Sequence, residues 1–289
     1  MSKKKILVTG ANGQLGSEIN ELANTFSDFE FLFTDRSQLS ISDENAVNDF
    51  FDKHQPDFCI NCAAYTAVDK AEDPAELPLV ETINADAAGF VAKACAKYHT
   101  RFIHISTDYV FDGIGTEPYK EYDKTEPVSV YGITKLKGEQ NALKYTDVVI
   151  IRTAWVYSAF GKNFVKTMMR LMQDKTQINV VSDQYGTPTY AADLASAIMQ
   201  IIVSENWQPG IYHYTNEGKI NWHEFALAIK ELIKSDCDIK AIPSIQYPTP
   251  AKRPAWSVLD KTKIKEVYNI KIPDWKESLA VCIGTMKEY

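Results

Sequence analysis

The first half of the chain alternates apolar runs with amphipathic stretches, and this alternation constrains the fold more than any other feature. Runs rich in Val, Ile and Phe lie at residues 4–10, 29–35, 57–64, 101–107 and 147–153. Between them, apolar residues recur at helical spacing, as in residues 13–26. Continuous apolar runs are typical of strands that are buried on both faces in a parallel sheet. The sequence therefore predicts an α/β fold with a doubly wound parallel sheet.

The second half of the chain has a different texture. Residues 178–183 and 190–205 have the pattern of one more strand and helix of the sheet. Farther along, short strands and helices alternate around a Pro-rich segment, residues 243–256. We expect this later part to form a smaller α/β lobe that binds substrate. The expected sheet domain comprises residues 1–155 and about 176–205, and the expected lobe comprises residues of about 156–175 and 206–289.

Charge and cysteine usage disfavour several classes of partner. The 289 residues carry a net charge of −7, and no basic stripe offsets it, which disfavours nucleic acid. No apolar stretch approaches the ~20 residues that cross a membrane. The five cysteines are an odd and scattered set, which indicates reduced thiols rather than a disulfide framework. We therefore expect a cytoplasmic protein without a nucleic acid or membrane partner.

Three glycines lie between the first strand and the first helix, in the segment VTGANGQLG (8–16). Glycines at such a turn let backbone N–H groups approach a pyrophosphate, and the helix start adds a partial positive charge. Gly10, Gly13 and Gly16 follow the spacing GxxGxxG rather than the GxGxxG of the standard dinucleotide fingerprint. Asp35 ends the second strand 19 positions after Gly16, close to the ~20 expected of a carboxylate that binds an adenosine ribose. The segment predicts a Rossmann domain that binds NAD or NADP.

Arg36, which follows Asp35, affects the choice of cofactor. A carboxylate favours the free 2′-hydroxyl of NAD, whereas a guanidinium group can pair with the 2′-phosphate of NADP. The adjacent pair predicts that the protein uses both NADH and NADPH.

A hydroxyl, a phenol and an ammonium group are predicted to meet at one edge of the sheet. Thr107 ends the fourth strand, and ligands bind beyond the carboxyl ends of parallel strands. Tyr131 and Lys135 are four positions apart in the following helix and therefore share one face of it. Hydride transfer to a carbonyl leaves an alkoxide, which a phenol can protonate. We expect Lys135 to lower the pKa of Tyr131 and to bind the nicotinamide ribose, and Thr107 to orient the carbonyl oxygen.

Six longer segments accompany the glycine loop, Thr107 and the Tyr131–Lys135 pair. They are NCAAYTAVDKAE, STDYVFDG, VYGITKLKGE, RTAWVY, GTPTYAADLA and YPTPAKRP. With these features the chain resembles the extended short-chain dehydrogenases/reductases that act on nucleotide sugars. Within that group it is similar to the dTDP-4-dehydrorhamnose reductases, and the similarity runs from about residue 5 to the C-terminus.

The resemblance implies an activity, a cofactor and a set of site residues. The activity is reduction of the 4-keto group of dTDP-4-dehydro-L-rhamnose by NADPH or NADH, which yields dTDP-L-rhamnose in the last step of its biosynthesis. The catalytic set is Thr107, Tyr131 as proton donor, and Lys135. The cofactor-binding set is Gly10, Asn12, Gly13, Gln14, Leu15, Asp35, Arg36, Ala64, Tyr65, Thr66, Tyr131 and Lys135. The substrate-binding set is Thr107, Asp108, Trp155, Asn163 and Arg253, the last of which would bind the diphosphate.

Some members of this family carry a magnesium ion, Mg2+, bound by glutamates at a dimer contact. Glu18 and Glu288 lie at matching positions. At the third position, in the segment TYAADLA, Ala192 stands beside Asp193 and no glutamate is present. We therefore favour helix-surface carboxylates over a magnesium site, and the corresponding homodimer is left open.

Three alternative functions belong to the same fold. A 4,6-dehydratase commonly has an Asp-Glu pair after the strand-end Thr, but here Asp108 is followed by Tyr109. A 4-epimerase would retain its NAD and return the hydride, and the sequence leaves that activity open. A non-catalytic regulatory subunit that binds NADP is the third alternative, and the presence of Tyr131 and Lys135 disfavours it.

Overall fold

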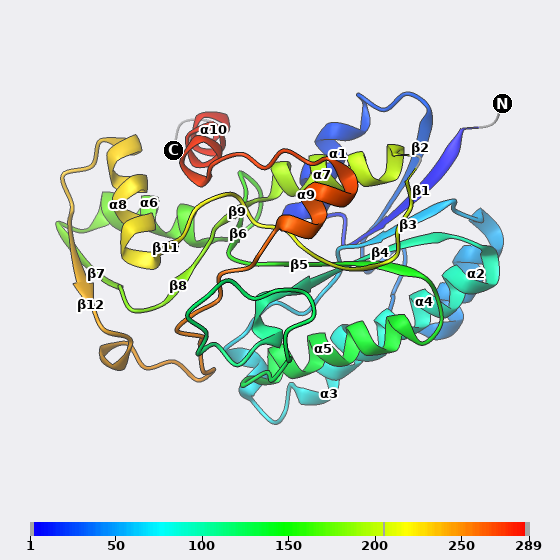
Figure 1. Cartoon of the computed structure of the whole chain (residues 1–289), viewed down its shortest axis with the longest axis horizontal. Coiled ribbons are helices and arrows are strands. Elements are labelled where there is room, and N and C mark those ends of the chain that lie inside the picture. The colour runs from blue at the N-terminus through cyan, green and yellow to red at the C-terminus, as the bar shows by residue number, and fades with distance from the viewer. Residues whose placement is uncertain (1–2, 205, 287–289) are drawn as a thin grey trace.

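The computed structural model describes residues 3–204 and 206–286 of the chain. Within these residues, a central sheet of six parallel strands has the order β10-β5-β4-β3-β1-β2 (Figure 1). The strands are β1 (Lys4–Thr9), β2 (Phe29–Thr34), β3 (Phe58–Asn61), β4 (Arg101–Thr107), β5 (Val148–Thr153) and β10 (Gly210–His213). The chain steps outward from β1 to β2 and then returns to β3 on the other side of β1. The doubly wound parallel sheet is thus confirmed, with a topological switch point between β1 and β3.

Helices cover both faces of the sheet. One face carries α1 (Gln14–Ala23) and α7 (Ala191–Val203), and the other carries α2 (Glu44–His54), α4 (Ala87–Tyr98) and α5 (Val130–Leu143) (Figure 1). In β1, Ile6 and Val8 belong to the core under α1 and α7, whereas Leu7 belongs to the core under α2 and α4. This burial on both faces is why the strands are continuous apolar runs in the sequence.

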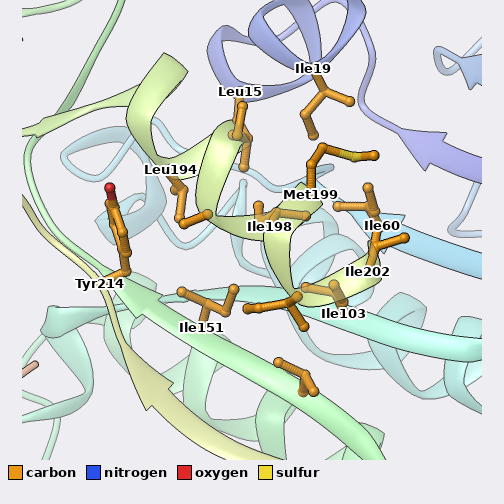
Figure 2. Packing of buried hydrophobic residues seen from close by; sticks show 14 of the residues in the cluster. Leu15, Ile19, Ile60, Ile103, Ile151, Leu194, Ile198, Met199, Ile202 and Tyr214 are labelled. Atoms are coloured by element: carbon orange, nitrogen blue, oxygen red, sulfur yellow. The ribbon is translucent and has the colours of Figure 1, made fainter. Parts of the chain in front are cut away.

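The core between α7 and the sheet is tightly packed. Leu194 and Ile198 of α7 lie against Ile103 and Ile151 of the sheet (Figure 2), and all four side chains are fully buried. Truncating such a side chain to Ala typically costs about 2–5 kcal/mol of folding free energy. The carboxyl edge of the sheet is therefore a rigid base for functional groups.

The smaller lobe forms the left part of Figure 1, with α10 at its top. It contains β7 (Gln177–Val181), β12 (Asp238–Ile242), α6 (Phe164–Asp174), α8 (Trp222–Ile233) and α10 (Trp275–Thr285). Val165, Met169, Phe225 and Leu279 are buried in a core of its own. A mixed α/β lobe beside the sheet domain agrees with the expected fold class.

Two strand expectations are wrong. The first is that residues 178–183 add a strand to the central sheet. β7 pairs with β12 instead, and its side chains are alternately exposed and buried, as in a strand with one face in solvent. The sixth place in the sheet, beside β5, belongs to β10, whose residues the sequence pattern places in the lobe. The expected helix, α7, does pack on the central sheet. The strand that forms a unit with it is β10, which follows α7 in the chain. The boundaries of the two domains stay a prediction.

The remaining elements are short. They are α3 (Leu77–Glu81), a π-helical turn (Thr82–Asp86) that continues into α4, α9 (Thr262–Tyr268), 3-10 turns at Lys70–Glu72, Asp108–Val110 and Ser244–Gln246, and the strand pairs β6 (Val156–Tyr157) with β9 (Thr189–Tyr190) and β8 (Tyr185–Gly186) with β11 (Ile220–Asn221). In the described part of the chain, none of the helices is long and apolar enough to cross a membrane.

Candidate active site

A cleft of about 840 Å³ is lined by residues at the carboxyl ends of the central strands and by residues of the lobe. Most of the residues predicted for the site line this cleft: Gly10, Asn12, Gly13, Gln14, Leu15, Asp35, Arg36, Ala64, Thr66, Thr107, Asp108, Tyr131, Lys135 and Trp155. Tyr65, Asn163 and Arg253 are not among its lining residues. The cleft lies where the topological switch point of an open α/β sheet places a ligand.

The glycine loop, residues 10–16, brings backbone rather than side chains to the cleft. Gly10 has a φ of +67°, and a Cβ there would lie 2.7 Å from the Cα of Ala63. A Cβ on Gly16 would lie 2.5 Å from the carbonyl oxygen of Gly10. Gly13 is the N-cap of α1, and no side chain caps this helix start. The loop therefore has the features that a dinucleotide pyrophosphate requires: close backbone approach and an open helix N-terminus.

A carboxylate stands at the end of β2, beside this loop. The hydroxyl of Ser37 donates to Asp35 Oδ1 at 2.6 Å, and Asn12 Nδ2 donates to Asp35 Oδ2 at 2.8 Å. The hydrogen bonds from Ser37 hold the pKa of Asp35 below its ordinary value. Arg36 next to it is exposed. The ionised carboxylate of Asp35 and the exposed guanidinium group of Arg36 are thus both available to the adenosine ribose of a dinucleotide.

The start of α5 fixes Tyr131 in the cleft. The side chain of Ser129 accepts a hydrogen bond from the backbone N–H of Gly132 at 3.2 Å, and Glu72 Oε1 accepts from the N–H of Val130 at 2.8 Å. A Cβ on Gly132 would collide with the carbonyl oxygen of Tyr109. These contacts hold the first turn of α5 close to the strand-end segment after β4.

Burial dominates the electrostatics of the Tyr131–Lys135 pair. It raises the pKa of Tyr131 to about 12, although a hydrogen bond with Thr107 opposes this. It lowers the pKa of Lys135 to about 8, and Lys135 Nζ donates to the carbonyl oxygen of Ile105 at 2.6 Å. The expected lowering of the pKa of Tyr131 by Lys135 is therefore not seen, because burial is the largest cause of the shift and it raises the pKa.

A buried ion pair near Lys135 is not predicted by any motif in the sequence. Glu139 lies one turn after Lys135 and accepts two hydrogen bonds from Arg152 of β5, at 2.9 and 2.7 Å. The hydroxyl of Ser106 donates to the same carboxylate at 2.5 Å. The negative charge of Glu139 raises the pKa of Lys135 against the effect of burial. The i,i+4 spacing of Lys135 and Glu139 was a usable signal for this contact, but the role of Arg152 requires the fold.

Thr107 and Asp108 form a second hydrogen-bonded unit in the cleft. Thr107 Oγ1 donates to Asp108 Oδ1 at 2.9 Å and accepts from the N–H of Tyr109 at 3.2 Å. Burial raises the pKa of Asp108 to about 6. Its carboxyl group therefore changes protonation between pH 5 and 7, close to the range in which enzymes work.

Two tryptophans form the lobe side of the cleft. Trp155, which the sequence predicts, stacks on Trp222, which it does not; their ring centroids are 3.5 Å apart. Both residues line the cleft. No local motif marks Trp222, because it comes from the first turn of α8 in the lobe.

The three predicted residues outside the cleft lining have structural contacts. Tyr65 donates through its hydroxyl to Glu76 at 2.9 Å. Asn163 is the N-cap of α6 and donates to Gln14 Oε1 at 2.9 Å. Arg253 makes two parallel hydrogen bonds to Asp69, both of 2.8 Å. Asn163 thus fixes a residue of the glycine loop, whereas Arg253 ties the lobe to the loop after β3.

Of the two candidate metal residues, Glu18 lies in the described part of the chain. Glu18 is buried and accepts a hydrogen bond from Ser158 at 2.6 Å, so its expected position on a helix surface is wrong. Burial raises the pKa of its carboxyl group. Glu288 lies outside the described residues. Within residues 3–204 and 206–286, no group of three or more His, Cys, Asp or Glu side chains could hold a metal ion.

Comparisons with known proteins find similar sequences over nearly the whole chain. A family model described as the RmlD substrate binding domain matches residues 4–288. A dTDP-4-dehydrorhamnose reductase of Aggregatibacter actinomycetemcomitans is 40% identical, over 95% of this chain and 97% of its own length. The spore coat polysaccharide biosynthesis protein SpsK of Bacillus subtilis is also 40% identical, over 95% of each chain.

Solved structures show the same fold. A dTDP-4-dehydrorhamnose reductase of Clostridium acetobutylicum superposes with a TM-score of 0.93, at 40% identity, over 98% of this chain and 100% of that one. A dTDP-4-dehydrorhamnose reductase of Bacillus anthracis, solved in complex with NADP, also has a TM-score of 0.93, at 35% identity over 97% and 99% of the two chains.

Proposed function

The chain belongs to the dTDP-4-dehydrorhamnose reductase family, and from this premise we propose that it reduces dTDP-4-dehydro-L-rhamnose to dTDP-L-rhamnose with NADPH or NADH. The observation that carries the proposal is a single cleft that contains the glycine loop together with Thr107, Tyr131 and Lys135. A dinucleotide loop alone would suit many reactions, whereas these three groups suit a carbonyl reduction.

The cleft fits a nicotinamide cofactor. The glycine loop would hold the pyrophosphate, Asp35 the adenosine ribose, and Lys135 the nicotinamide ribose, while Ala64 and Thr66 would line the passage to the nicotinamide. When bound, NADPH or NADH supplies the hydride that reduces the 4-keto carbon.

Tyr131 donates the proton that completes the reduction. Because burial keeps the pKa of Tyr131 near 12, its phenol is protonated at neutral pH and ready to donate to the C4 oxygen. Thr107 hydrogen-bonds the same oxygen and sets its distance from the phenol. Lys135, whose pKa burial lowers to about 8, is still mostly cationic at pH 7 and stabilises negative charge beside Tyr131.

The substrate-side residues have distinct proposed roles. Asp108 and Trp155 would contact the sugar, because both line the cleft near Thr107. Arg253 would reach the diphosphate only after it leaves Asp69, with which it is paired. Asn163 would act indirectly, through Gln14. A homodimer and a cytoplasmic location stay predictions.

The Asp35–Arg36 pair is the proposed reason for the use of both cofactors. We expect Arg36→Ala to raise KM for NADPH by about tenfold, the equivalent of one lost charge-assisted contact of ~1.4 kcal/mol, and to leave KM for NADH unchanged. A strong kcat/KM preference for NADH that is the same in Arg36→Ala would contradict this role of Arg36.

The decisive experiment is an NADPH-consumption assay with dTDP-4-dehydro-L-rhamnose, compared with the GDP and UDP 4-keto sugars. Stoichiometric NADPH oxidation with the dTDP sugar is the expected result. Inversion of the sugar without net oxidation would indicate an epimerase. Binding of NADP without turnover of any of these sugars would indicate a regulatory subunit.

A further inference from the structure

Trp155 and Trp222 are stacked more closely than two free indoles would be. Their ring centroids are 3.5 Å apart and their planes differ by 13°. Aromatic pairs prefer offset or edge-to-face arrangements, with centroids about 4.5–7 Å apart. The surrounding structure therefore imposes this arrangement, and both residues line the cleft that contains Tyr131.

Trp155 is held in an unfavourable backbone conformation. Its φ is +47°, in the left-handed region that a bulky residue seldom occupies. Gly186 leaves room for the indole, because a Cβ at that position would lie 2.8 Å from Cε2 and Cζ2 of Trp155. Strained residues of this kind persist only where neighbouring groups fix them, and they concentrate at functional sites.

Trp222 is itself firmly anchored. It is the first residue of α8, and the capping box of Asn221 and Glu224 fixes the start of that helix with hydrogen bonds of 2.9 and 2.8 Å. The ring of Phe164 from α6 packs against it with a centroid distance of 4.6 Å. The lobe therefore presents the indole of Trp222 as a fixed platform.

We propose that Trp222 is a positioning residue for the sugar-nucleotide substrate. Its indole holds Trp155 in place, so that Trp155 forms a rigid apolar wall of the cleft against which the sugar lies. This role rests on the proposed function. Packing of the lobe core alone would require neither the left-handed backbone of Trp155 nor the exposure of both rings to the cleft.

A double-mutant cycle tests whether Trp222 acts through Trp155. We expect Trp155→Ala and Trp222→Ala each to raise KM for dTDP-4-dehydro-L-rhamnose by about 3- to 10-fold, the effect of losing an aromatic contact. KM for NADPH should stay unchanged. The double variant should be no worse than Trp155→Ala, because Trp222 has no role once Trp155 is absent. Additive losses, or an equal loss of NADPH binding, would overturn the proposal.

The far-ultraviolet circular dichroism spectrum gives a second measurement. Stacked indoles produce an exciton couplet, which should vanish in Trp222→Phe and persist in Trp207→Phe, the matched control outside the cleft. Trp222→Phe keeps a flat ring and should regain part of the KM that Trp222→Ala loses. If Trp222→Ala does not fold, Trp222→Leu decides instead, because it keeps apolar bulk without a flat ring: a wild-type KM in that variant would overturn the proposal. A wild-type protein that does not reduce the sugar would refute the proposed function instead.

Discussion

The glycine loop (residues 10–16) and the tryptophan pair (Trp155 and Trp222) both line the cleft, but different forces shape them. The loop is shaped by its backbone, since a Cβ on Gly10 or Gly16 would meet neighbouring backbone atoms at 2.7 and 2.5 Å. The tryptophan pair is shaped by contact between two side chains that only folding brings together. One is a local property of the sequence, and the other is a property of the tertiary structure.

Because the loop is shaped by backbone and the tryptophan pair by side chains, we expect cofactor binding and substrate binding to depend on different parts of the cleft. A pyrophosphate is the same in every dinucleotide, and backbone N–H groups at a helix start recognise it without the help of side chains. A sugar differs from one substrate to the next, and side chains on a separate lobe can be exchanged without disturbing the loop. We therefore expect variants at the two places to lose cofactor binding and substrate binding separately.

Replacing Tyr131 by Phe should leave both binding tasks intact and remove the chemistry. The ring remains, while the proton donor is lost. We expect kcat to fall by about 10²- to 10⁴-fold, the usual contribution of a general acid, with the Kd for NADPH unchanged. Steady-state kinetics together with fluorescence titration of NADPH measure both quantities. An unchanged kcat would show that Tyr131 is not the donor.

Asp108→Asn should stabilise the protein and impair its activity. Burial raises the folded-state pKa of Asp108 to about 6, above the unfolded value of 3.8. The stability that the neutral carboxyl group gives the folded protein is therefore complete below pH 3.8 and is lost as the pH rises through 6. The variant should therefore gain nothing at pH 3.8 or below and about 3 kcal/mol above pH 6, since one pKa unit is 1.36 kcal/mol.

Urea denaturation between pH 4 and pH 7.5 measures this difference. An advantage of Asp108→Asn that is the same across the range would mean that the carboxyl group is not the cause. The accompanying loss of activity should appear in kcat and in KM for the sugar, and the Kd for NADPH should not change.

Gly10→Ala should act on the glycine loop alone. The φ of +67° and the approach of Ala63 make any side chain costly there, by about 1–3 kcal/mol. We expect a weaker Kd for NADPH, by about tenfold for each 1.4 kcal/mol that falls on the bound state. Gly284→Ala in α10 is the control, because a Cβ there meets nothing within 4 Å, and it should leave NADPH binding unchanged. Equal effects of Gly10→Ala and Gly284→Ala on the Kd for NADPH would show that the backbone of the glycine loop does not determine cofactor binding.

The features that the sequence predicts are the local ones, and those that it does not predict depend on tertiary contacts. The parallel sheet, the glycine loop and the strand-end Thr107 depend on residues that are neighbours in the chain, and local patterns predict where each lies. The two misassigned strands, β7 and β10, show the limit of local patterns. A short apolar run can join either sheet, and its pairing partner is known only from the folded chain.

The contacts that local sequence patterns do not predict have one property in common. Glu139 of α5 pairs with Arg152 of β5, and Trp222 of α8 stacks on Trp155, which follows β5 in the chain. Glu18 has the spacing of a surface residue on α1, yet it is buried because Ser158 covers it from another segment. In each case the partner lies outside the local segment, so a short sequence motif does not contain it.

Arg253→Lys should have the smallest effect, because it weakens one contact between the lobe and the loop after β3. The guanidinium group makes two hydrogen bonds to Asp69, and a lysine can supply only a point charge. Since both side chains are partly exposed, we expect the free energy of unfolding to fall by less than about 1 kcal/mol.

If Arg253 leaves Asp69 to bind the diphosphate, Asp69→Asn should lower KM for the sugar while Arg253→Lys raises it. Opposite shifts in KM, measured with the Kd for NADPH unchanged, would assign the substrate contact to Arg253, whereas parallel shifts would make the ion pair a purely structural tie.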